Sequence, residues 1–258
     1  MTAIDLSIYQ MMFALVFIFA AALSSFLLNL GLHRDILWGS IRMISQLVLM
    51  GYVLTYVFQL NSPWLVLLVF GVMIFFAANI IKGRVKGGKI AYYYPTLISM
   101  FLSYIIVTYF ITAIVINVEP WYQPQYFIPL GGMVVGNSMN AISISLERLF
   151  SQLRDKRDLV EMYLTVGADY KEASADITRE AISAGMIPAI NSLMGMGLVF
   201  LPGMMTGQIL AGADPLFAIK YQIVIMMMVV GATAMGSILV TLLVRRRCFS
   251  PDNRLLVR

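Results

Sequence analysis

Polar side chains interrupt one of the long apolar stretches of this chain, and they are the first candidates for binding a solute. Asn137, Ser138, Met139 and Asn140 follow one another in the sequence GNSMN. A polar group inside a membrane needs a partner, and it often marks a substrate path. Joining one helix to the next is the commoner use of such residues. The spacing leaves both roles open, with Asn137 and Asn140 on one helical face.

Methionines and a glutamine form a second candidate group, nearer the C-terminus. Met204 and Met205 follow a stretch rich in glycine and proline, and Gln208 lies one helical turn after Met204. Thioether sulfur binds soft metals such as Cu(I), although methionine is also an ordinary filler of gaps between helices. The glycines and prolines predict a broken or re-entrant helix end, which membranes tolerate where the backbone lines a cavity. We therefore place these three residues on the candidate substrate path.

Arg42 is the one basic residue that lies well inside an apolar stretch, and Gln46 follows it by one turn. A charge near the middle of a membrane usually faces the interior of the bundle or water. Arg42 lies about 9 Å from the expected end of its helix, at about 1.5 Å per residue, so its guanidinium could also extend to the membrane surface. Both interpretations stay open, and Arg42 and Gln46 remain candidates for the substrate path.

A glycine-rich segment imitates a nucleotide-binding loop. The residues from Gly83 to Lys89 have the G-x-x-x-x-G-K spacing of a P-loop, but Ile90 stands where a Ser or Thr would hold magnesium. The segment also follows an apolar helix, whereas the motif needs a strand before it. We therefore expect a basic turn without a cofactor and a chain that is not an enzyme. The energy for any transport would come from a partner or from a gradient.

The composition of the chain is that of a polytopic membrane protein. Of the 258 residues, 60% are hydrophobic and 12% are charged, against about 25% charged in soluble domains. The single cysteine, Cys248, excludes an intrachain disulfide, and the single histidine, His33, argues against a histidine-based metal site. We expect one all-α transmembrane domain over residues 1–258, a helical bundle integral to the plasma membrane, which is the inner membrane of a bacterium.

A helix needs about 20 apolar residues to cross the hydrocarbon core, and seven segments approach that length. The sixth is the shortest and contains Pro188, so its boundaries are the hardest to place. The seven expected spans are Ile8–Leu30, Ile36–Gln59, Trp64–Ile81, Tyr92–Val118, Phe127–Leu146, Gly185–Leu201 and Phe217–Val244.

The basic residues are distributed unevenly between the two sides of these spans. Of the eighteen Lys and Arg residues, sixteen lie on one side: Arg34 and those in residues 82–89, 147–184 and 245–258. The opposite loops hold Lys220 alone. Because cytoplasmic loops carry the excess of Lys and Arg, we expect the N-terminus outside and the C-terminus in the cytoplasm. The net charge of +5 then reflects topology and attraction to the lipid bilayer. Basic residues spread over four segments do not predict a nucleic-acid partner.

The segment between the fifth and sixth spans is the most highly charged part of the chain, with eight acidic and six basic residues in 147–180. Gly167 can cap a helix at its C-terminus, and Asp169 with Glu172 has the spacing of a capping box. We predict a cytoplasmic loop, about residues 147–184, with two helices joined at Gly167-Ala168. It is either a plain connection or a docking element for a soluble partner. One apolar helical stripe runs along Leu159, Tyr163, Val166, Tyr170, Ala173, Ile177 and Ala181.

The docking interpretation gains support from a resemblance. Importers of the ABC class carry a cytoplasmic EAA loop, with Glu and Gly six residues apart and an Ile ten further on, and Glu161, Gly167 and Ile177 have these offsets. Met162 and Tyr163 replace the two alanines of that motif, and no Leu-Pro follows at the expected place. The likeness implies a role in ATPase coupling, which we assign to Glu161, Val166, Gly167, Ala168, Asp169 and Tyr170.

A second resemblance covers residues 36–245. The sequence MVVGNSMNAISISLERL, from Met133 to Leu149, is similar to the signature of the FetB/YbbM-type ABC permeases, the iron-export permease family with plant relatives in aluminium tolerance. Arg42 with Gln46-Leu47, GAD at 167–169 and the segments 184–212 and 221–226 also match. The resemblance implies the membrane half of an iron exporter, a homodimer bound to two copies of a cytoplasmic ABC ATPase that holds ATP and Mg²⁺. It also implies that residues 202–205 lie near an external gate.

Two other functions fit the residues less well. A gradient-driven secondary transporter of a small solute or metal usually places acidic residues or histidine within its spans, and here Glu147 lies only at the edge of one. A seven-helix retinal protein needs a lysine inside the membrane, whereas all six lysines fall in loops. We keep the secondary transporter as the alternative to ATP-driven transport.

Overall fold

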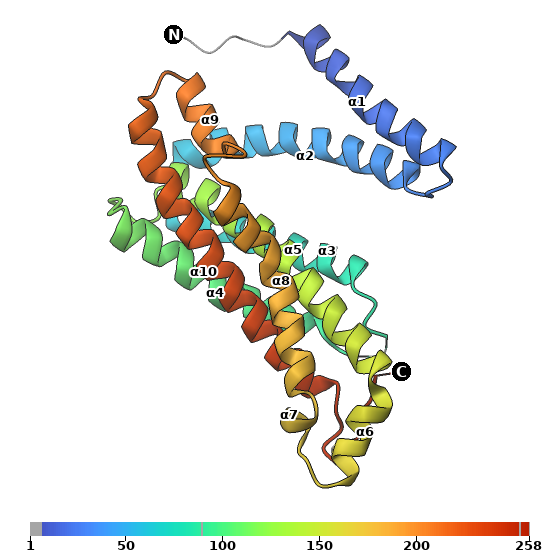
Figure 1. Ribbon diagram of the computed structural model, residues 1–258. Coiled ribbons are helices and arrows are strands. Elements are labelled where there is room, and N and C mark those ends of the chain that lie inside the picture. The colour runs from blue at the N-terminus through green and yellow to red at the C-terminus, as the bar shows by residue number, and fades with distance from the viewer. Residues whose placement is uncertain (1–6, 89, 253, 258) are drawn as a thin grey trace.

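The computed structural model describes residues 7–88, 90–252 and 254–257, and most of that chain is helical (Figure 1). The β structure in these residues is limited to two isolated bridges, so the all-α fold class is confirmed. The elements in chain order are α1 (Ile8–Leu27), α2 (His33–Leu60), α3 (Pro63–Arg84), α4 (Tyr93–Tyr109), the π-helix η1 (Phe110–Val115), α5 (Pro124–Asp155), α6 (Arg157–Thr165), α7 (Tyr170–Ala173), α8 (Ala175–Gly195), α9 (Gly203–Leu210) and α10 (Pro215–Arg247).

Six of the described helices are long and apolar enough to cross a membrane, which makes the chain an integral, multi-pass membrane protein. They are α1, α2, α3, α4 with its continuation η1, α5 and α10. The predicted bounds of the sixth span, residues 185–201, are wrong, because α8 begins at Ala175 and ends at Gly195. Asp176, Arg179 and Glu180 therefore occupy its first turns, and α8 is not among the six apolar helices.

The helix ends carry signals that the sequence contains. α3, α5 and α10 each begin with a proline, which lacks an N–H where that group has no intrahelical partner. Asp214 caps α10 by accepting a hydrogen bond from the Phe217 N–H at 3.0 Å. α4 passes without a loop into η1, and π-helical segments of this kind are frequent at functional sites.

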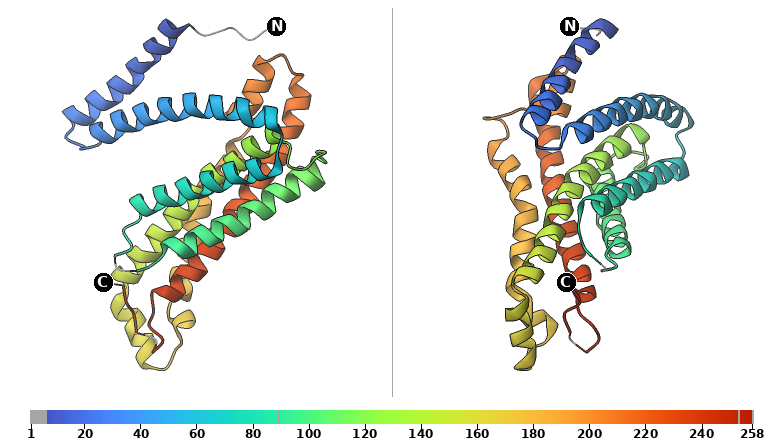
Figure 2. Two further views of the ribbon diagram at one scale, coloured as in Figure 1. Left: turned by 180° about the vertical axis from the view of Figure 1, so that it is seen from behind. Right: turned by 90° about the vertical axis from the view of Figure 1, so that its right-hand side faces the viewer.

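α5 is the central helix of a bundle in which it packs against α3, α4, α8 and α10. The views in Figures 1 and 2 show these helices running side by side. The Phe127 ring of α5 meets the Phe70 ring of α3 edge to face, with 5.4 Å between the ring centroids. A Cβ at Gly131 would lie 2.5 Å from that same Phe70 ring. The glycine therefore allows α3 and α5 to approach, as small residues do in membrane helices generally.

α1 and α2 form a hairpin that stands away from this bundle (Figure 2). Most side chains of both helices are exposed, including the large rings of Phe13, Phe17 and Trp38. The buried residue of α2 is Val57, near the end that leads into the bundle. Apolar surfaces of this extent need lipid or another protein chain around them.

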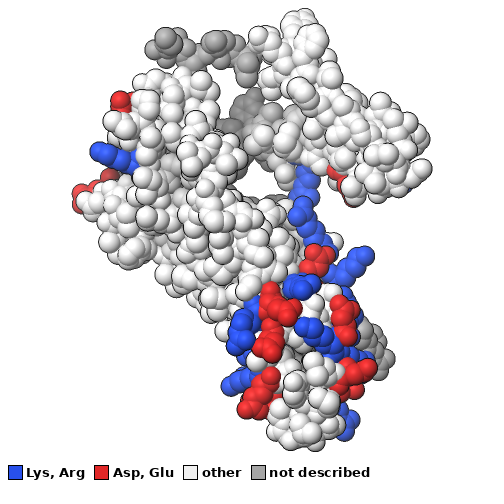
Figure 3. All heavy atoms as spheres, in the orientation of Figure 1, with Lys and Arg blue, Asp and Glu red and all other residues white. Residues whose placement is uncertain are grey.

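The two ends of the bundle differ in charge. Acidic and basic side chains gather over α6, α7 and the adjoining helix ends, which we call the charged end (Figure 3). α9 lies at the opposite end, which we call the α9 end (Figure 1). There the chain is non-helical between Gly195, where α8 stops, and Gly203, where α9 starts. The glycines and prolines of this segment predict such a break.

Candidate functional site

The charged end is built around a tight turn at Gly167. This residue has a φ of +99°, a left-handed conformation that favours glycine. Its N–H donates to the Leu164 carbonyl at 3.2 Å, and the Ala168 N–H donates to the Tyr163 carbonyl at 3.0 Å. The two bonds form a Schellman motif, the usual way in which a glycine ends a helix. The structure therefore has the turn that the sequence predicts at Gly167-Ala168.

Asp169 begins the next helix through the capping box predicted from its spacing to Glu172. Its carboxylate accepts hydrogen bonds from the N–H groups of Lys171 (2.8 Å) and Glu172 (2.7 Å), and the Glu172 carboxylate accepts from the Asp169 N–H (3.0 Å). The expected single second helix is divided, however, because α7 ends at Ala173 and α8 starts at Ala175. The Ser174 hydroxyl between them donates to the Tyr170 carbonyl, a local bond that competes with regular helix.

The apolar stripe predicted along this segment divides into a buried half and an exposed half. The buried half lies against the bundle and comprises Ala173, Ile177 and Ala181. The exposed half lies on α6 and the turn, where Val166 is 77% exposed. With Met162 it forms a cluster that we call the tip surface: Leu159, Met162, Tyr163 and Val166. Exposed apolar side chains that cluster in a charged region are typical of a protein-interaction site.

Ion pairs flank the tip surface and connect it to the bundle. The Glu161 carboxylate lies 2.7 Å from the Arg157 guanidinium, one turn earlier on α6. Glu180 of α8 pairs with Arg148 of α5 at 3.4 Å and with Lys156, which follows α5, at 3.2 Å. All five side chains are roughly 40–50% exposed, and exposed pairs contribute about 0–1 kcal/mol each. The pairs therefore contribute little to the stability of the fold, and those of Glu180 join α8 to the end of α5 and to the start of α6.

Tyr170, the last of the predicted coupling residues, connects the turn to α10. The Arg245 guanidinium lies 5.7 Å from the centroid of the Tyr170 ring, and its Nη1 donates to the Thr178 hydroxyl at 3.3 Å. The Phe249 ring lies 5.8 Å from the Tyr170 ring between centroids. Sequence reasoning misses this anchor because Arg245 begins a run of three arginines that topology alone explains.

The C-terminal tail folds back over the end of α10. Phe249 and Leu255 form an antiparallel bridge, and the Leu256 N–H donates to the Cys248 carbonyl at 2.8 Å. Cys248 is completely buried at this point. Burial raises the pKa of its thiol to about 12, so very little reactive thiolate exists at neutral pH.

Replacing Leu255 with aspartate should release the tail, because the change puts a charge at a buried position. We expect maleimide to label Cys248 at least about tenfold faster in Leu255→Asp than in the unaltered chain, since exposure restores the thiolate. The rate would be followed by mass spectrometry of the purified protein. Arg254→Gln changes an exposed residue of the same tail and should leave labelling slow. Equal rates in the two variants would show that the tail does not protect Cys248.

At the α9 end, two residues of the candidate substrate path lie together. Met204 and Gln208 line a pocket of about 200 Å³ between α5, α9 and α10, which we call the α9 pocket. Met205 is buried and does not line it. The pocket combines carboxamide, phenol and thioether groups, which can bind a polar solute or a cation. Its lining comprises Gln125, Tyr126, Pro129, Leu130, Met204, Gln208, Phe217 and Tyr221.

Ser138 and Met139 of α5 do not reach this pocket. The buried Ser138 hydroxyl lies 3.2 Å from the Thr233 hydroxyl of α10, within hydrogen-bonding distance. Met139 is partly buried and packs against the hydrophobic core. These contacts show Ser138 and Met139 packed between helices, which fits the helix-joining role rather than the substrate path.

Asn137 and Asn140 lie on an exposed face of α5 beside Gly136. The Asn137 side-chain amide donates to the Met133 carbonyl of its own helix at 2.8 Å. The Asn140 carbonyl oxygen accepts from the Arg84 guanidinium at 3.5 Å. This face is therefore free, within a single chain, to meet water, lipid or a second subunit.

The other predicted residues do not join the α9 pocket, and only the imitation P-loop touches the charged end, where the Lys86 carbonyl accepts from the Arg154 guanidinium at 3.2 Å. Arg42 and Gln46 are exposed on α2, in the hairpin that stands away from the bundle, so the structure does not bring them to the α9 pocket. The imitation P-loop begins at Gly83, where α3 is still helical, and its Lys89 lies outside the described residues. A helix therefore stands where a nucleotide-binding loop would follow a strand.

Comparison with known proteins shows the family to which the chain belongs. One family model, described as an uncharacterised protein family, UPF0014, matches residues 8–249. The chain belongs to the UPF0014 family. A UPF0014 membrane protein of Synechocystis is 40% identical over 89% of this chain and 88% of its own length. The probable iron export permease protein FetB of Escherichia coli is 34% identical over 95% of this chain and 93% of its own.

The plant protein ALUMINUM SENSITIVE 3 of Arabidopsis thaliana is 34% identical over 89% of this UPF0014 chain and 83% of its own length. No solved structure matches the chain. The region that matches the UPF0014 model includes the tip surface, the Gly167 turn and the α9 pocket. The candidate sites at the charged end and at the α9 end therefore both lie in the region that matches the family.

Proposed function

We propose that this UPF0014 chain is the membrane permease subunit of an ABC exporter, and that a separate cytoplasmic ATPase binds at its charged end. The tip surface carries the proposal, because four exposed apolar side chains cluster in the charged region of an otherwise membrane-embedded protein. A soluble partner that covers them would remove this apolar area from water. Co-purification of a soluble P-loop ATPase with the detergent-solubilised chain tests the proposal, and a chain that transports without any such subunit contradicts it.

Two helices connect the region of the tip surface with the α9 end and could transmit motion between them. The Gly167 turn leads through α7 into α8, whose 21 residues extend about 30 Å, the thickness of the hydrocarbon core. Tyr170 and Arg245 connect the same turn to α10, which lines the pocket through Tyr221. Movement of an ATPase against the tip surface would therefore shift both α8 and α10 at the α9 end.

In the proposed orientation the charged end lies in the cytoplasm and the N-terminus outside. The excess of Lys and Arg at one end of the bundle (Figure 3) supports it, because cytoplasmic loops carry such an excess. The α9 pocket then lies on the external side, where an exporter releases its cargo. The broken helix between α8 and α9 fits a gate there, since irregular backbone at membrane depth occurs where it lines a cavity.

The exposed residues of α2 and α5 support a homodimer. Arg42 and Gln46 on α2 and Asn137 on α5 are polar side chains within membrane-crossing helices. Such groups usually face protein or water, but here a single chain leaves them uncovered. A second copy of the chain would enclose both faces, and Gly136, with open space beside it, would allow a close helix approach.

We propose a metal cargo, with iron as the first to test, because FetB carries the name of an iron export permease. The described residues contain no cluster of three or more His, Cys, Asp or Glu that could hold a metal ion. The α9 pocket would instead contact the cargo through Gln125, Gln208, Tyr126, Tyr221 and Met204.

Replacing Gln208 with leucine should lower the transport rate about three- to tenfold, because one hydrogen bond contributes about 0.5–1.5 kcal/mol. Tyr126→Phe, which removes one hydroxyl from the same pocket, should have an effect of similar size. Efflux of ⁵⁵Fe from preloaded cells measures both. Gln59→Leu is the matched control, since Gln59 lies exposed on α2 and does not line the pocket. Equal efflux in all three variants would exclude the α9 pocket from the path.

A further inference from the structure

Two arginines at the charged end are not used by the proposed coupling site. Arg246 and Arg247 lie in the last turn of α10 and are exposed. Among the described residues neither takes part in an ion pair, whereas Arg148, Arg157 and Arg179 all do. Two adjacent cations that no carboxylate pairs with create a local positive field that attracts an anion.

The two arginines border a hollow of about 920 Å³ between the end of α10, the start of α4 and the C-terminal tail. The wall from α4 includes Tyr94, Pro95 and Ile98, and the tail contributes Phe249 and Leu256. The hollow is therefore basic at one edge and apolar along its sides. A ligand that fits it carries both a negative charge and a hydrocarbon part.

The first turn of α4 adds a second source of positive potential to this hollow. α4 begins at Tyr93 without a side-chain cap, so the N–H groups of Tyr93 and Tyr94 have no partner within the helix, whereas Pro95 carries no N–H. The helix dipole places partial positive charge at the same point. Oxyanions, phosphate above all, bind helix N-termini for these reasons. The α4 start and the two arginines thus favour the same class of group.

Exposed apolar side chains of α4 and α10 lead from the hollow toward the middle of the bundle, and we call the surface between them the α4–α10 groove. α4 and α10 run antiparallel and pack against each other, and each presents a line of side chains spaced by four residues. Every member of the two lines is exposed, between 36% and 55%. The lines are Ile98, Leu102 and Ile106 on α4, and Leu243, Leu239 and Met235 on α10.

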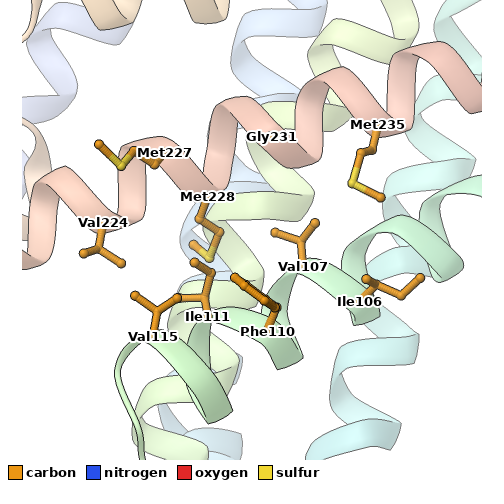
Figure 4. Close-up of a pocket in the computed structure, with 10 residues that line it drawn as sticks. All are labelled: Ile106, Val107, Phe110, Ile111, Val115, Val224, Met227, Met228, Gly231 and Met235. Carbon is orange, nitrogen blue, oxygen red and sulfur yellow. The ribbon is translucent and has the colours of Figure 1, made fainter.

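The groove ends in a second, wholly apolar hollow of about 430 Å³. Figure 4 shows Met228 and Met235 of α10 on one side of it, facing Val107, Ile111 and Phe110 of α4 and η1. From Leu243 to Met235 the helix rises about 12 Å, and half of the hydrocarbon core is about 15 Å thick. The groove therefore has the length of one membrane leaflet.

We propose that an anionic phospholipid occupies this groove. Its phosphate lies between Arg246, Arg247 and the α4 N-terminus, and one acyl chain follows the α4–α10 groove to the methionines of the second hollow. In the orientation proposed above the site faces the cytoplasmic leaflet, which carries anionic lipid. The hollow includes none of the tip-surface or α9-pocket side chains, although it shares Tyr170 with the proposed connection to α10. Lipid binding to the chain alone is measured without the ATPase, so its failure would leave the proposed function untouched.

Native mass spectrometry of the full-length chain in detergent, titrated with palmitoyl-oleoyl phosphatidylglycerol, tests the site. We expect one tightly bound lipid, and about thirtyfold weaker binding in Arg246→Gln/Arg247→Gln, the loss that two lipid-facing arginines predict. Lys86→Gln/Arg254→Gln removes the same charge from exposed positions outside the hollow and should bind within about twofold of the unaltered chain. Arg246→Lys/Arg247→Lys, which keeps the charge, should restore most of the binding.

Three further measurements distinguish an anionic phospholipid from a neutral lipid, free phosphate or a second copy of the chain as the occupant of the groove. Phosphatidylcholine should bind much more weakly, and inorganic phosphate at millimolar concentration should not displace the lipid. Leu102→Trp/Leu239→Trp, which fills the groove, should weaken phosphatidylglycerol binding about as much as the double glutamine variant. Equal binding in the two charge variants, or displacement by phosphate alone, would overturn the proposal. A second copy of the chain is the other candidate occupant. If the tryptophan variant dissociated a dimer but still bound the lipid, the second copy would fill the groove and the proposal would be wrong.

Discussion

A glutamate in place of Val166 should separate the permease from its ATPase. Val166 is the most exposed side chain of the tip surface, at 77%, so the change leaves the fold of the free chain intact. In a complex the new carboxylate would be buried against an apolar contact, and burying an unpaired charge costs about 2 kcal/mol or more. We therefore expect ATPase binding to weaken at least about thirtyfold, measured by quantitative co-purification, and iron efflux to fall with it.

Arg254→Gln is the control for this variant, because it shifts the net charge by the same amount at an exposed residue outside α6 and the turn. Membrane insertion and thermal stability of both variants should equal those of the unaltered chain. If Val166→Glu retained full ATPase binding while Gly167→Val lost it, the turn would matter but the tip surface would not be the contact. That result would remove the observation on which the proposed function rests.

Valine at Gly185 should destabilise the packing of α8 against α5. A Cβ at this position of α8 would lie 2.6 Å from the Ala141 carbonyl oxygen of α5 and would also meet the Ser145 side chain. The Ala141 oxygen belongs to the backbone of α5, so it cannot rotate away as a side chain would. The added Cβ therefore fits only if α5 or α8 moves as a whole. Overpacking of this kind costs about 1–3 kcal/mol, and we expect a lower unfolding midpoint together with loss of transport.

Gly71→Val provides the matched comparison for Gly185→Val. Gly71 lies within α3, and a Cβ there meets nothing within 4 Å, so the substitution should leave the midpoint almost unchanged. Unfolding of the purified protein in detergent, followed by circular dichroism, measures both. If the two variants unfolded at the same temperature, α5 and α8 would not pack as closely as the structure has them.

Local sequence signals account well for the turn at the charged end. Gly167 and the pair Asp169 and Glu172 each act on neighbouring backbone groups, so their spacing predicts the C-terminal cap, the tight turn and the capping box. The interruption before α9 is predictable for the same reason, since glycine and proline act where they stand. The all-α class and most of the spans follow from apolar length alone.

Non-local contacts explain where the sequence-based account is incomplete. Helical periodicity groups Val166 with Ile177 on one stripe, but the Gly167 turn and the break at Ser174 divide that stripe among α6, α7 and α8, and only its second half meets the bundle. The bounds of α8 differ from prediction because the helix continues from the charged loop into the membrane without a signal at the boundary. The α9 pocket joins residues from α5, α9 and α10, and Tyr126 and Tyr221 have no sequence feature that would bring them together.

ATP-driven transport in a defined system tests the central claim most directly. Inside-out proteoliposomes would contain the purified chain and its ATPase, and ⁵⁵Fe uptake would be followed on addition of ATP or of a pH gradient. We predict uptake that requires ATP and the ATPase, is absent with a hydrolysis-deficient ATPase, and is lost in Val166→Glu. Uptake driven by the pH gradient in vesicles without the ATPase would contradict the account and identify a secondary transporter.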